Sequence, residues 1–310
     1  MSKTALLFPG QGSQYVGMAR DLHEASAEVR ALYELASAEI GDDIARISFE
    51  GPAHELQRTR FTQPAILLHS LAVLTILKDN VPAFDCAAGH SLGEYGALAV
   101  SGALTFEDAI RAVVRRAALM EEACRKHPST MAAILGLDRQ KVEEICLTAG
   151  ASGVVVPANF NSAAQIVISG ELQAIEEAVS LARTAGAKRA VMLEVGGAFH
   201  SPLMESAAAG MEQFLAGIKI TSPTKPVIAN VTAQPVTDPP LIRSLLVRQI
   251  TAPVRWTETM EWLAQNDVTT VVEIGPGKVL SALAKRQMRP ANIVTLGTRA
   301  EVEAAAMVTM

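Results

Sequence analysis

Several things are scarce in this 310-residue sequence, and each scarcity excludes a class of protein. Only three cysteines occur, Cys86, Cys124 and Cys146, with no C-x-x-C pair and no cysteine–histidine spacing typical of a metal finger. We therefore expect free thiols in a reducing cytoplasm, without a disulfide framework. Charged residues make up 19% of the chain and the net charge is −5, which argues against nucleic acid or an anionic membrane surface as the main partner.

Long apolar runs are also missing. The N-terminal run at residues 5–8 is too short for the core of a signal peptide. No stretch is expected to reach the roughly 20 apolar residues that a membrane helix needs. With 49% apolar residues, the chain can instead bury a sizeable core, in one large domain or two of moderate size. These features predict a soluble, cytoplasmic globular enzyme that binds neither a membrane nor nucleic acid.

Apolar runs and helical periodicities alternate along most of the chain. They predict strands at residues 4–8, 83–88, 226–230 and 269–274, and helices at 16–40, 62–79, 94–101, 105–124 and 279–287. Between them, the segments 131–135, 138–149, 153–159, 165–170, 171–185 and 189–195 read as strand, helix, strand, strand, helix and strand. That β-α-β-β-α-β order is the signature of a ferredoxin-like domain.

The predicted architecture is therefore an α/β fold with an insertion. Residues 1–126 and 197–310 would form a larger, hydrolase-like catalytic domain around a central, mainly parallel sheet. Residues 127–196 would form a small ferredoxin-like α+β domain.

Gly89-His90-Ser91-Leu92-Gly93 fits the G-x-S-x-G pattern of a nucleophile elbow. A predicted strand precedes it and a predicted helix follows it, which is the context that the pattern requires. A serine hydroxyl needs a positioned base, and His200 follows a predicted strand and two glycines, after the serine in chain order. The alternative is that Ser91 and His200 are unrelated loop residues. His90, beside the serine, should point away from it and shape the loop.

An acyl-transfer site also needs hydrogen-bond donors where negative charge develops on the carbonyl oxygen. The elbow offers the backbone N–H of Leu92, and the glycine-containing loop at residues 9–14 is a candidate for the second donor. A phosphate loop is the rival interpretation of residues 9–14. It fails because no Lys-Ser/Thr pair follows and Tyr15 stands where G-x-G-x-x-G needs glycine.

The helix predicted from Thr105 carries one arginine at an unusual position. Its apolar stripe consists of Ile110, Val113, Val114, Ala117 and Met120. Arg111 and Arg115 fall on the far side, whereas Arg116 falls at the edge of the stripe. A partly desolvated guanidinium there would bind a planar anion or form a structural salt bridge, and periodicity leaves both open.

Taken in order, these motifs resemble the malonyl-CoA:acyl-carrier-protein transacylases, which share their fold and activity with the acyltransferase domains of fatty-acid and polyketide synthases. The resemblance covers nearly the whole chain. It rests on residues 8–14 (FPGQGSQ), 89–94 (GHSLGE), Arg116, 159–162 (NFNS), 199–204 (FHSPLM), 249–256 (QITAPVRW) and 273–277 (EIGPG).

The resemblance implies a role for each candidate residue. Ser91 would carry the acyl group as an ester, with His200 as its general base and acid. Gln11 and the backbone of Leu92 would form the oxyanion hole, and a backbone carbonyl near Gln249 would orient the histidine in place of an aspartate. Arg116 would pair with the malonyl carboxylate. The other substrate-binding positions would be His90, Phe199 and Asn161, where Phe199 resembles malonyl-type rather than methylmalonyl-type members.

The implied reaction moves a malonyl group from malonyl-CoA to the phosphopantetheine thiol of acyl carrier protein by a ping-pong mechanism, with no metal and no bound cofactor. Carrier proteins are acidic, and Lys188-Arg189 and Lys285-Arg286 are candidates for a basic docking surface. Three alternatives remain. They are a stand-alone acyltransferase of a polyketide synthase or a malonate decarboxylase subunit, an acyl-thioester hydrolase, and a non-catalytic carrier-binding module.

Overall fold

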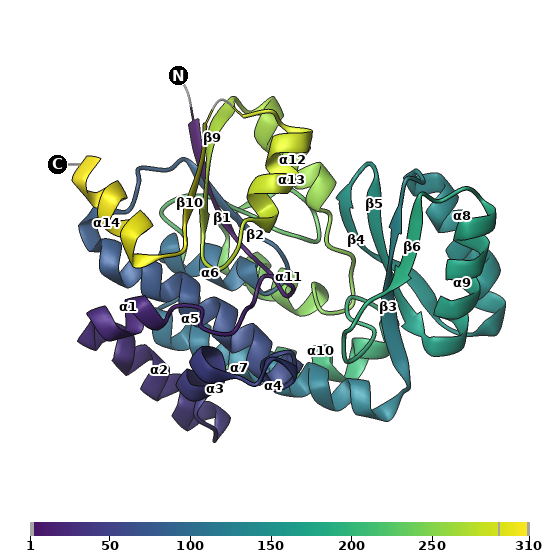
Figure 1. The fold of residues 1–310 in the computed structure, drawn as a ribbon, viewed down its shortest axis with the longest axis horizontal. Coiled ribbons are helices and arrows are strands. Elements are labelled where there is room, and N and C mark those ends of the chain that lie inside the picture. Colours follow the sequence, from purple (N-terminus) through teal and green to yellow (C-terminus); the bar gives the residue numbers. More distant parts are fainter. Residues whose placement is uncertain (1–2, 291, 309–310) are drawn as a thin grey trace.

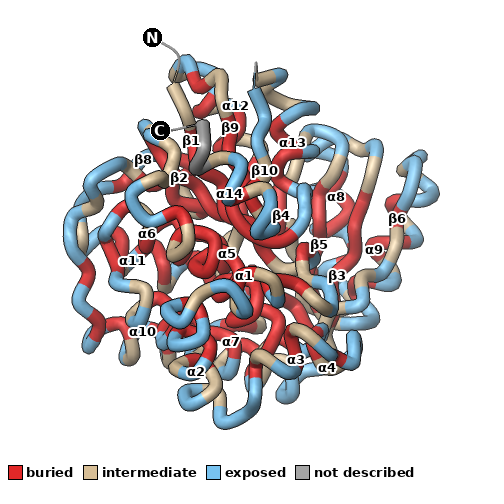
Figure 2. The backbone as a smooth tube through the Cα atoms, turned by 60° about the vertical axis from the view of Figure 1, so that its left-hand side comes forward, coloured by how far each residue is buried: buried red, intermediate tan, exposed pale blue. Residues whose placement is uncertain are grey.

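A computed structural model describes residues 3–290 and 292–308 of the chain, which form a larger and a smaller part side by side (Figure 1). The larger part, on the left in Figure 1, contains both ends of the described chain. The smaller part, on the right, is formed by residues 129–192. Buried residues concentrate in the middle of the larger part, around its sheet and central helices (Figure 2).

The larger part is built on a six-stranded sheet. Its strands are β1 (Lys3–Phe8), β2 (Cys86–Gly89), β7 (Val227–Ile228), β8 (Pro235–Val236), β9 (Val268–Ile274) and β10 (Asn292–Leu296), in the spatial order β10-β9-β1-β2-β7-β8. All neighbours are parallel except β7 and β8. Because Phe8 pairs with Gly89, β1 and β2 end side by side. The loops that carry Gln11 and Ser91 therefore start next to each other.

Side chains of β1 alternate between the two faces of this sheet, as a strand of period two requires. Ala5 and Leu7 pack in the core that contains residues of α12 (Trp256–Gln265) and α13 (Val279–Gln287). Leu6 and Phe8 pack in the larger core on the opposite face. Among the described residues, ten helices contribute to this larger core: α1 (Arg20–Ala25), α2 (Ala27–Ile40), α3 (Ile44–Glu50), α4 (Ala53–Leu56), α5 (Thr59–Leu77), α6 (Gly93–Val100), α7 (Phe106–Lys126), α10 (Glu205–Ala216), α11 (Pro239–Arg248) and α14 (Arg299–Val308).

Helix α5 is the central helix of the larger part and packs against α7. By length and composition alone, the segment Thr59–Asn80 is apolar enough to cross a membrane, so the expectation that no segment approaches that limit was wrong. Inside the fold, 83% of its most apolar window is buried by the rest of the protein. Its apolarity is therefore that of a core helix, which the other helices and the sheet surround.

The smaller part is a four-stranded antiparallel sheet with two helices. Its elements are β3 (Ser129–Leu135), α8 (Arg139–Ala149), β4 (Val155–Ser162), β5 (Gln165–Glu171), α9 (Leu172–Thr184) and β6 (Arg189–Met192), and the strand order is β4-β5-β3-β6. Ala132 and Ile134 of β3 pack with residues of α8 and α9. Met131 and Ala133 point to the other face and join the core of the larger part. The small sheet is thus covered by its own helices on one side and by the larger part on the other.

Backbone hydrogen bonds join the two parts. The Phe160 N–H donates to the Val254 carbonyl oxygen at 2.9 Å, and the Val254 N–H donates to the Ala158 oxygen at 2.8 Å. Strand β4 is therefore hydrogen-bonded to the segment that precedes α12. These bonds hold the small sheet in place against the larger part.

Several sequence predictions differ from the structure in extent, among them the strand predicted at 83–88, which is found at Cys86–Gly89, and the helix predicted at 62–79, which is found at Thr59–Leu77. The helical pattern at 16–40 divides at Ser26, whose extended backbone ends α1 and whose hydroxyl accepts the Val29 N–H to start α2. The strand predicted at 189–195 ends at Met192, and the one at 226–230 shrinks to Val227–Ile228. By contrast, the helix at 279–287 has the predicted bounds.

Candidate active site

Ser91 stands at a sharp turn between β2 and α6, with a left-handed backbone conformation (φ 52°). A nucleophile elbow holds its serine in such a strained strand-to-helix turn. The two glycines of the motif are needed for close packing. A Cβ on Gly89 would lie 1.9 Å from the Gly93 carbonyl carbon, and a Cβ on Gly93 would lie 2.2 Å from the Phe8 carbonyl oxygen. Both glycines of G-x-S-x-G are therefore required, because the ends of β1 and β2 and the start of α6 approach too closely for a side chain at either position.

The His200 side chain contacts Ser91 in the same cavity, although 109 positions separate the two residues in the chain. The Ser91 Oγ and the His200 Nε2 are 2.8 Å apart, and the His200 Nδ1 is 2.8 Å from the Gln249 backbone oxygen. Because that carbonyl can only accept, Nδ1 carries the proton and Nε2 is left to accept the serine hydroxyl. Burial, and then the Arg116 charge, lower the pKa of His200 to about 3, so the imidazole is neutral at pH 7 and can act as a base.

Arg116 lies directly behind the serine and is completely buried. Its Nη2 donates to the Ser91 Oγ at 3.1 Å and to the Gln249 Oε1 at 3.0 Å, while Nη1 donates to the Gln63 Oε1 at 2.6 Å. Within the described chain the guanidinium has no carboxylate in ion-pair range. Of the two interpretations that periodicity left open, a structural salt bridge is therefore excluded, and Arg116 is a buried cation with neutral partners at the Ser91 hydroxyl.

Gln11 and Leu92 line the same cavity as Ser91. Across residues 3–290 and 292–308, neither backbone N–H donates a hydrogen bond to the protein. Two free backbone donors next to a nucleophile are what the stabilisation of an oxyanion requires.

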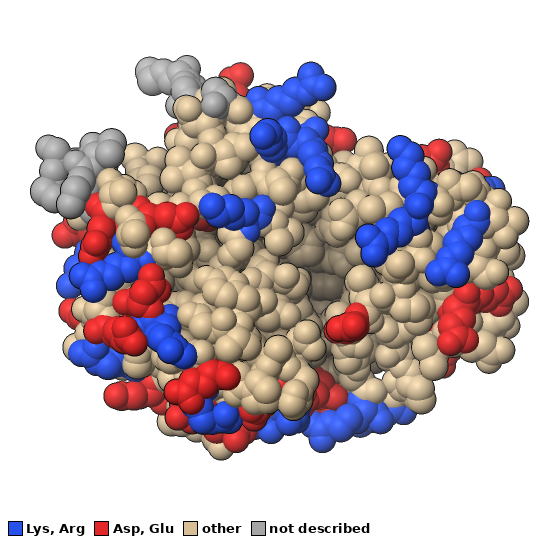
Figure 3. All heavy atoms as spheres, in the orientation of Figure 1, with Lys and Arg blue, Asp and Glu red and all other residues tan. Residues whose placement is uncertain are grey.

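The cavity has a volume of about 650 Å³ and lies between the two parts of the molecule. Figure 3 shows a hollow there, with lysine and arginine side chains gathered above it and to its right. Among the lining residues, Lys278 and Arg286 are exposed cations from the start and the body of α13. Phe199 is nearly buried and forms part of the wall.

His90 and Asn161 form a second contact across the cavity. The His90 Nε2 lies 2.8 Å from the Asn161 Oδ1, and both side chains line the cavity. The hydrogen bond of His90 to β4 links the elbow loop to the small sheet.

Two residues that the sequence analysis gave no role complete the site. The buried side chain of Asn230 accepts the Ser91 N–H at 2.7 Å and donates to the Gly89 oxygen at 2.7 Å, so it holds both sides of the elbow. The buried carboxylate of Glu94 accepts the Gln249 Nε2 at 2.7 Å. A polar residue ending a predicted strand, and an acid inside an otherwise apolar first turn, were the only sequence signals for them.

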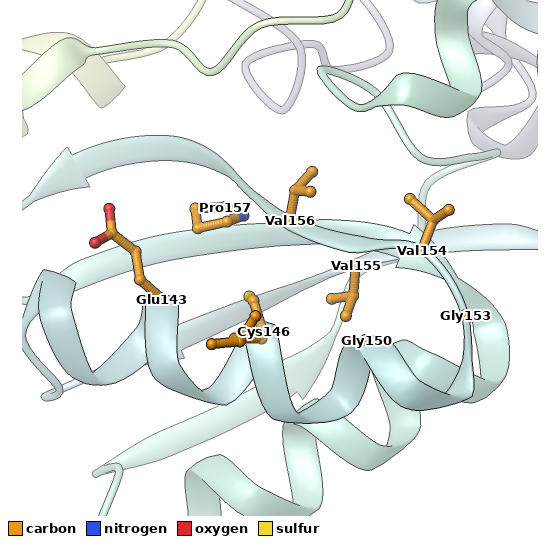
Figure 4. Close-up of a pocket in the computed structure, with 9 residues that line it drawn as sticks. Glu143, Cys146, Gly150, Gly153, Val154, Val155, Val156 and Pro157 are labelled. Carbon is orange, nitrogen blue, oxygen red and sulfur yellow. The ribbon is translucent and has the colours of Figure 1, made fainter.

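A second hollow lacks such chemistry. It has a volume of about 520 Å³ and lies on the small part. Figure 4 shows Glu143, Cys146 and Gly150 on the α8 side, facing Val155 and Pro157 of β4. This hollow contains neither member of the serine–histidine pair. The described residues also include no cluster of three or more metal-ligating side chains.

A half-buried serine bonded to a buried histidine, with free backbone donors at the carboxyl edge of a mainly parallel sheet, is the arrangement that covalent acyl chemistry requires. Comparison with known proteins places the chain within that class. Residues 5–309 match the acyl transferase domain family, and the chain belongs to this family.

Individual relatives agree over almost the full length. The malonyl CoA-acyl carrier protein transacylase of Haemophilus influenzae is 44% identical, with 92% of each chain covered. The acyl-carrier-protein S-malonyltransferase of Bartonella henselae superposes with a TM-score of 0.94 at 43% identity, covering 100% of this chain and 99% of that one. A malonyl-transacylase solved in complex with its holo type II PKS acyl-carrier protein superposes with a TM-score of 0.93 at 39% identity, covering 99% and 100%.

Proposed function

We propose that this protein transfers a malonyl group from malonyl-CoA to the phosphopantetheine thiol of an acyl carrier protein. One observation carries the proposal: the Arg116 Nη2 lies 3.1 Å from the Ser91 Oγ, which itself lies 2.8 Å from the His200 Nε2. A cation at this distance from the nucleophile selects an acyl group that carries its own negative charge. The named activities of the relatives support the same conclusion.

In the first half-reaction, the Ser91 oxygen attacks the thioester carbonyl carbon while its proton passes to the His200 Nε2. The carbonyl oxygen becomes an oxyanion that the N–H groups of Gln11 and Leu92 stabilise. As the carbonyl re-forms, the C–S bond breaks and the departing CoA sulfur takes the proton from His200. In the second half-reaction, the carrier thiol gives its proton to His200, attacks the serine ester and releases the Ser91 hydroxyl.

Arg116 binds the distal carboxylate of the acyl group in this scheme. The amide oxygens of Gln63 and Gln249 hold the guanidinium in the free protein, and they are neutral acceptors that a carboxylate can replace. Phe199 limits the space beside the acyl chain. His90 and Asn161, which are hydrogen-bonded to each other, form another part of the cavity wall. No metal and no bound cofactor takes part, and malonyl-CoA enters as a substrate.

The exposed cations Lys278 and Arg286 at the cavity support an anionic CoA or an acidic carrier protein as the partner. Residues 127–196, with their β-α-β-β-α-β order and antiparallel sheet, support the predicted ferredoxin-like insertion between a catalytic domain of 1–126 and 197–310. All three cysteines are free, which supports a cytoplasmic location.

The test uses malonyl-CoA together with holo or apo carrier protein. We expect malonyl to appear on the holo carrier in step with CoA release, and the apo carrier, which lacks the thiol, to accept nothing. Steady CoA release without a carrier, with free malonate as product, would instead identify a hydrolase. Carrier proteins from fatty-acid and polyketide systems, compared in the same assay, distinguish the two pathways, since one solved relative is bound to a PKS carrier.

A further inference from the structure

Glu94 is a buried acid beside the nucleophile that the proposed reaction does not use. It occupies the first turn of α6, three positions after Ser91, and is 2% exposed. Across the described residues it forms no ion pair. Its Oε2 accepts the Asn230 N–H at 3.0 Å and the Gln249 Nε2 at 2.7 Å. A buried carboxylate without a cation costs free energy, so its position calls for a functional reason.

The Gln249 side chain lies between Glu94 and Arg116. Its Nε2 donates to the Glu94 Oε2 and, at 3.1 Å, to the Ser91 backbone oxygen, while its Oε1 accepts from the Arg116 Nη2 at 3.0 Å. A carboxylate and a carbonyl can only accept, and a guanidinium can only donate. These partners therefore permit one orientation of the amide. Turned over, the amide would present its donors to the guanidinium.

The same residue also anchors the base, because the Gln249 backbone oxygen holds the His200 Nδ1. Helix α11 ends at Arg248, immediately before this residue, so its backbone and amide occupy a fixed position at a helix end. Glu94 is thus one hydrogen bond away from the residue that positions both the imidazole and the guanidinium.

We propose that Glu94 is a positioning residue that acts through the Gln249 amide, holding Arg116 at Ser91 while leaving its charge available to an anionic acyl group. This inference rests on the proposed function. A carboxylate placed directly on Arg116 would neutralise the guanidinium, and an incoming malonyl group would have to displace an anion. A neutral amide oxygen orients the cation without that competition. Burial raises the pKa of Glu94 to about 7, so its effect is best measured above neutral pH.

Serine acylation by malonyl-CoA and by acetyl-CoA, measured as kcat/KM at about pH 8, tests the proposal. In Glu94→Ala the Gln249 amide loses the carboxylate acceptor that fixes its orientation. We expect the malonyl-over-acetyl ratio to fall about tenfold, an effect on the scale of one buried hydrogen-bonded acceptor. In Glu94→Gln, the side-chain oxygen can accept both existing bonds, so the ratio should stay within about threefold of the wild type. Glu107→Ala is the matched control, since Glu107 is an exposed acid in the first turn of the next helix.

Two further variants keep the test decisive if Glu94→Ala does not fold. Gln249→Leu keeps the backbone oxygen for His200 and should lower the ratio as Glu94→Ala does. Where Glu94→Ala does fold, it should lower the ratio no further in the Gln249→Leu background, because Glu94 acts through this amide. Gln249→Glu places a charge directly on Arg116 and should reduce the malonyl preference more than leucine does.

If Glu94→Ala lowered kcat/KM equally for malonyl-CoA and acetyl-CoA, and if its effect added to that of Gln249→Leu in the double variant, Glu94 would have a merely structural role. That result would overturn the inference. An unchanged ratio in Gln249→Leu would overturn it as well. If the wild-type protein forms no acyl-enzyme with malonyl-CoA, the proposed function fails and this inference fails with it. If the wild-type protein is acylated and all ratios stay constant, only the inference fails.

Discussion

Replacing Arg116 with alanine gives the sharpest prediction about substrate choice. In the variant, the malonyl carboxylate would enter a buried position with no cation to pair with. Removing one partner of a buried ion pair typically costs about 3–5 kcal/mol. The amide groups of Gln63 and Gln249 would remain, and water could enter the space that the guanidinium leaves, so we take the lower end of that range. About 3 kcal/mol corresponds to a loss of roughly a hundredfold in kcat/KM for malonyl-CoA.

Acetyl-CoA should respond differently, because its methyl group leaves Arg116 unpaired in the wild-type site. Its kcat/KM should stay constant or rise, so the malonyl-over-acetyl ratio falls by roughly a hundredfold or more. The assay is the rate of CoA release in a single acylation turnover with each donor.

Arg115→Ala is the matched control for this prediction. It removes an exposed arginine at the neighbouring position of the same helix and should change neither rate. Melting curves for both variants separate misfolding from lost recognition. An unchanged ratio in a folded Arg116→Ala variant would refute the role given to the guanidinium.

Four other predictions concern the elbow and the base. Asn230→Ala removes the acceptor of the Ser91 N–H. It should slow acylation at least tenfold and lower the free energy of unfolding by about 1–3 kcal/mol. Asn230→Asp keeps the acceptor and should retain more activity. The pKa of His200 lies far below that of ordinary histidine, so acylation by acetyl-CoA, which has no carboxylate to bind Arg116, should not fall as pH drops through about 6.5. Because the Arg116 charge helps to lower that pKa, Arg116→Ala should raise it and move the acid limb of the acetyl-CoA pH–rate profile to higher pH. Gly89→Ala should lose about 3 kcal/mol or more in chemical unfolding, whereas Gly150→Ala, where an added Cβ meets nothing within 4 Å, should be tolerated.

Most of the larger elements were predictable because their signals are local. Thr105 and Asp138 cap α7 and α8 with their side chains, and both lie where the sequence predicted a helix to begin. The two-residue strands β7 and β8 were not predictable at their true length, because their limits depend on pairing with each other and with β2.

The residues of the candidate site differ in how far the sequence alone could assign their roles. Ser91 and His200 could be paired from motif context and chain order. Gln249 entered only through family resemblance, since a backbone carbonyl leaves no trace in the side-chain sequence. The burial of Arg116 depends on acceptors from α5 and from the end of α11, 53 and 133 positions away, which helical periodicity cannot reveal. The partners of Glu94 lie 136 and 155 positions away, so its role became visible only in three dimensions.

The central claim is that Ser91 carries the malonyl group as a covalent ester. Its most direct test is the intact-protein mass after mixing with malonyl-CoA, beside acetyl-CoA and a Ser91→Ala control. We predict a single malonyl adduct on the wild-type protein, located to Ser91 by peptide mapping, scarce with acetyl-CoA and absent from the control. An adduct that persists in Ser91→Ala, or malonyl transfer to the carrier by that variant, would contradict the claim.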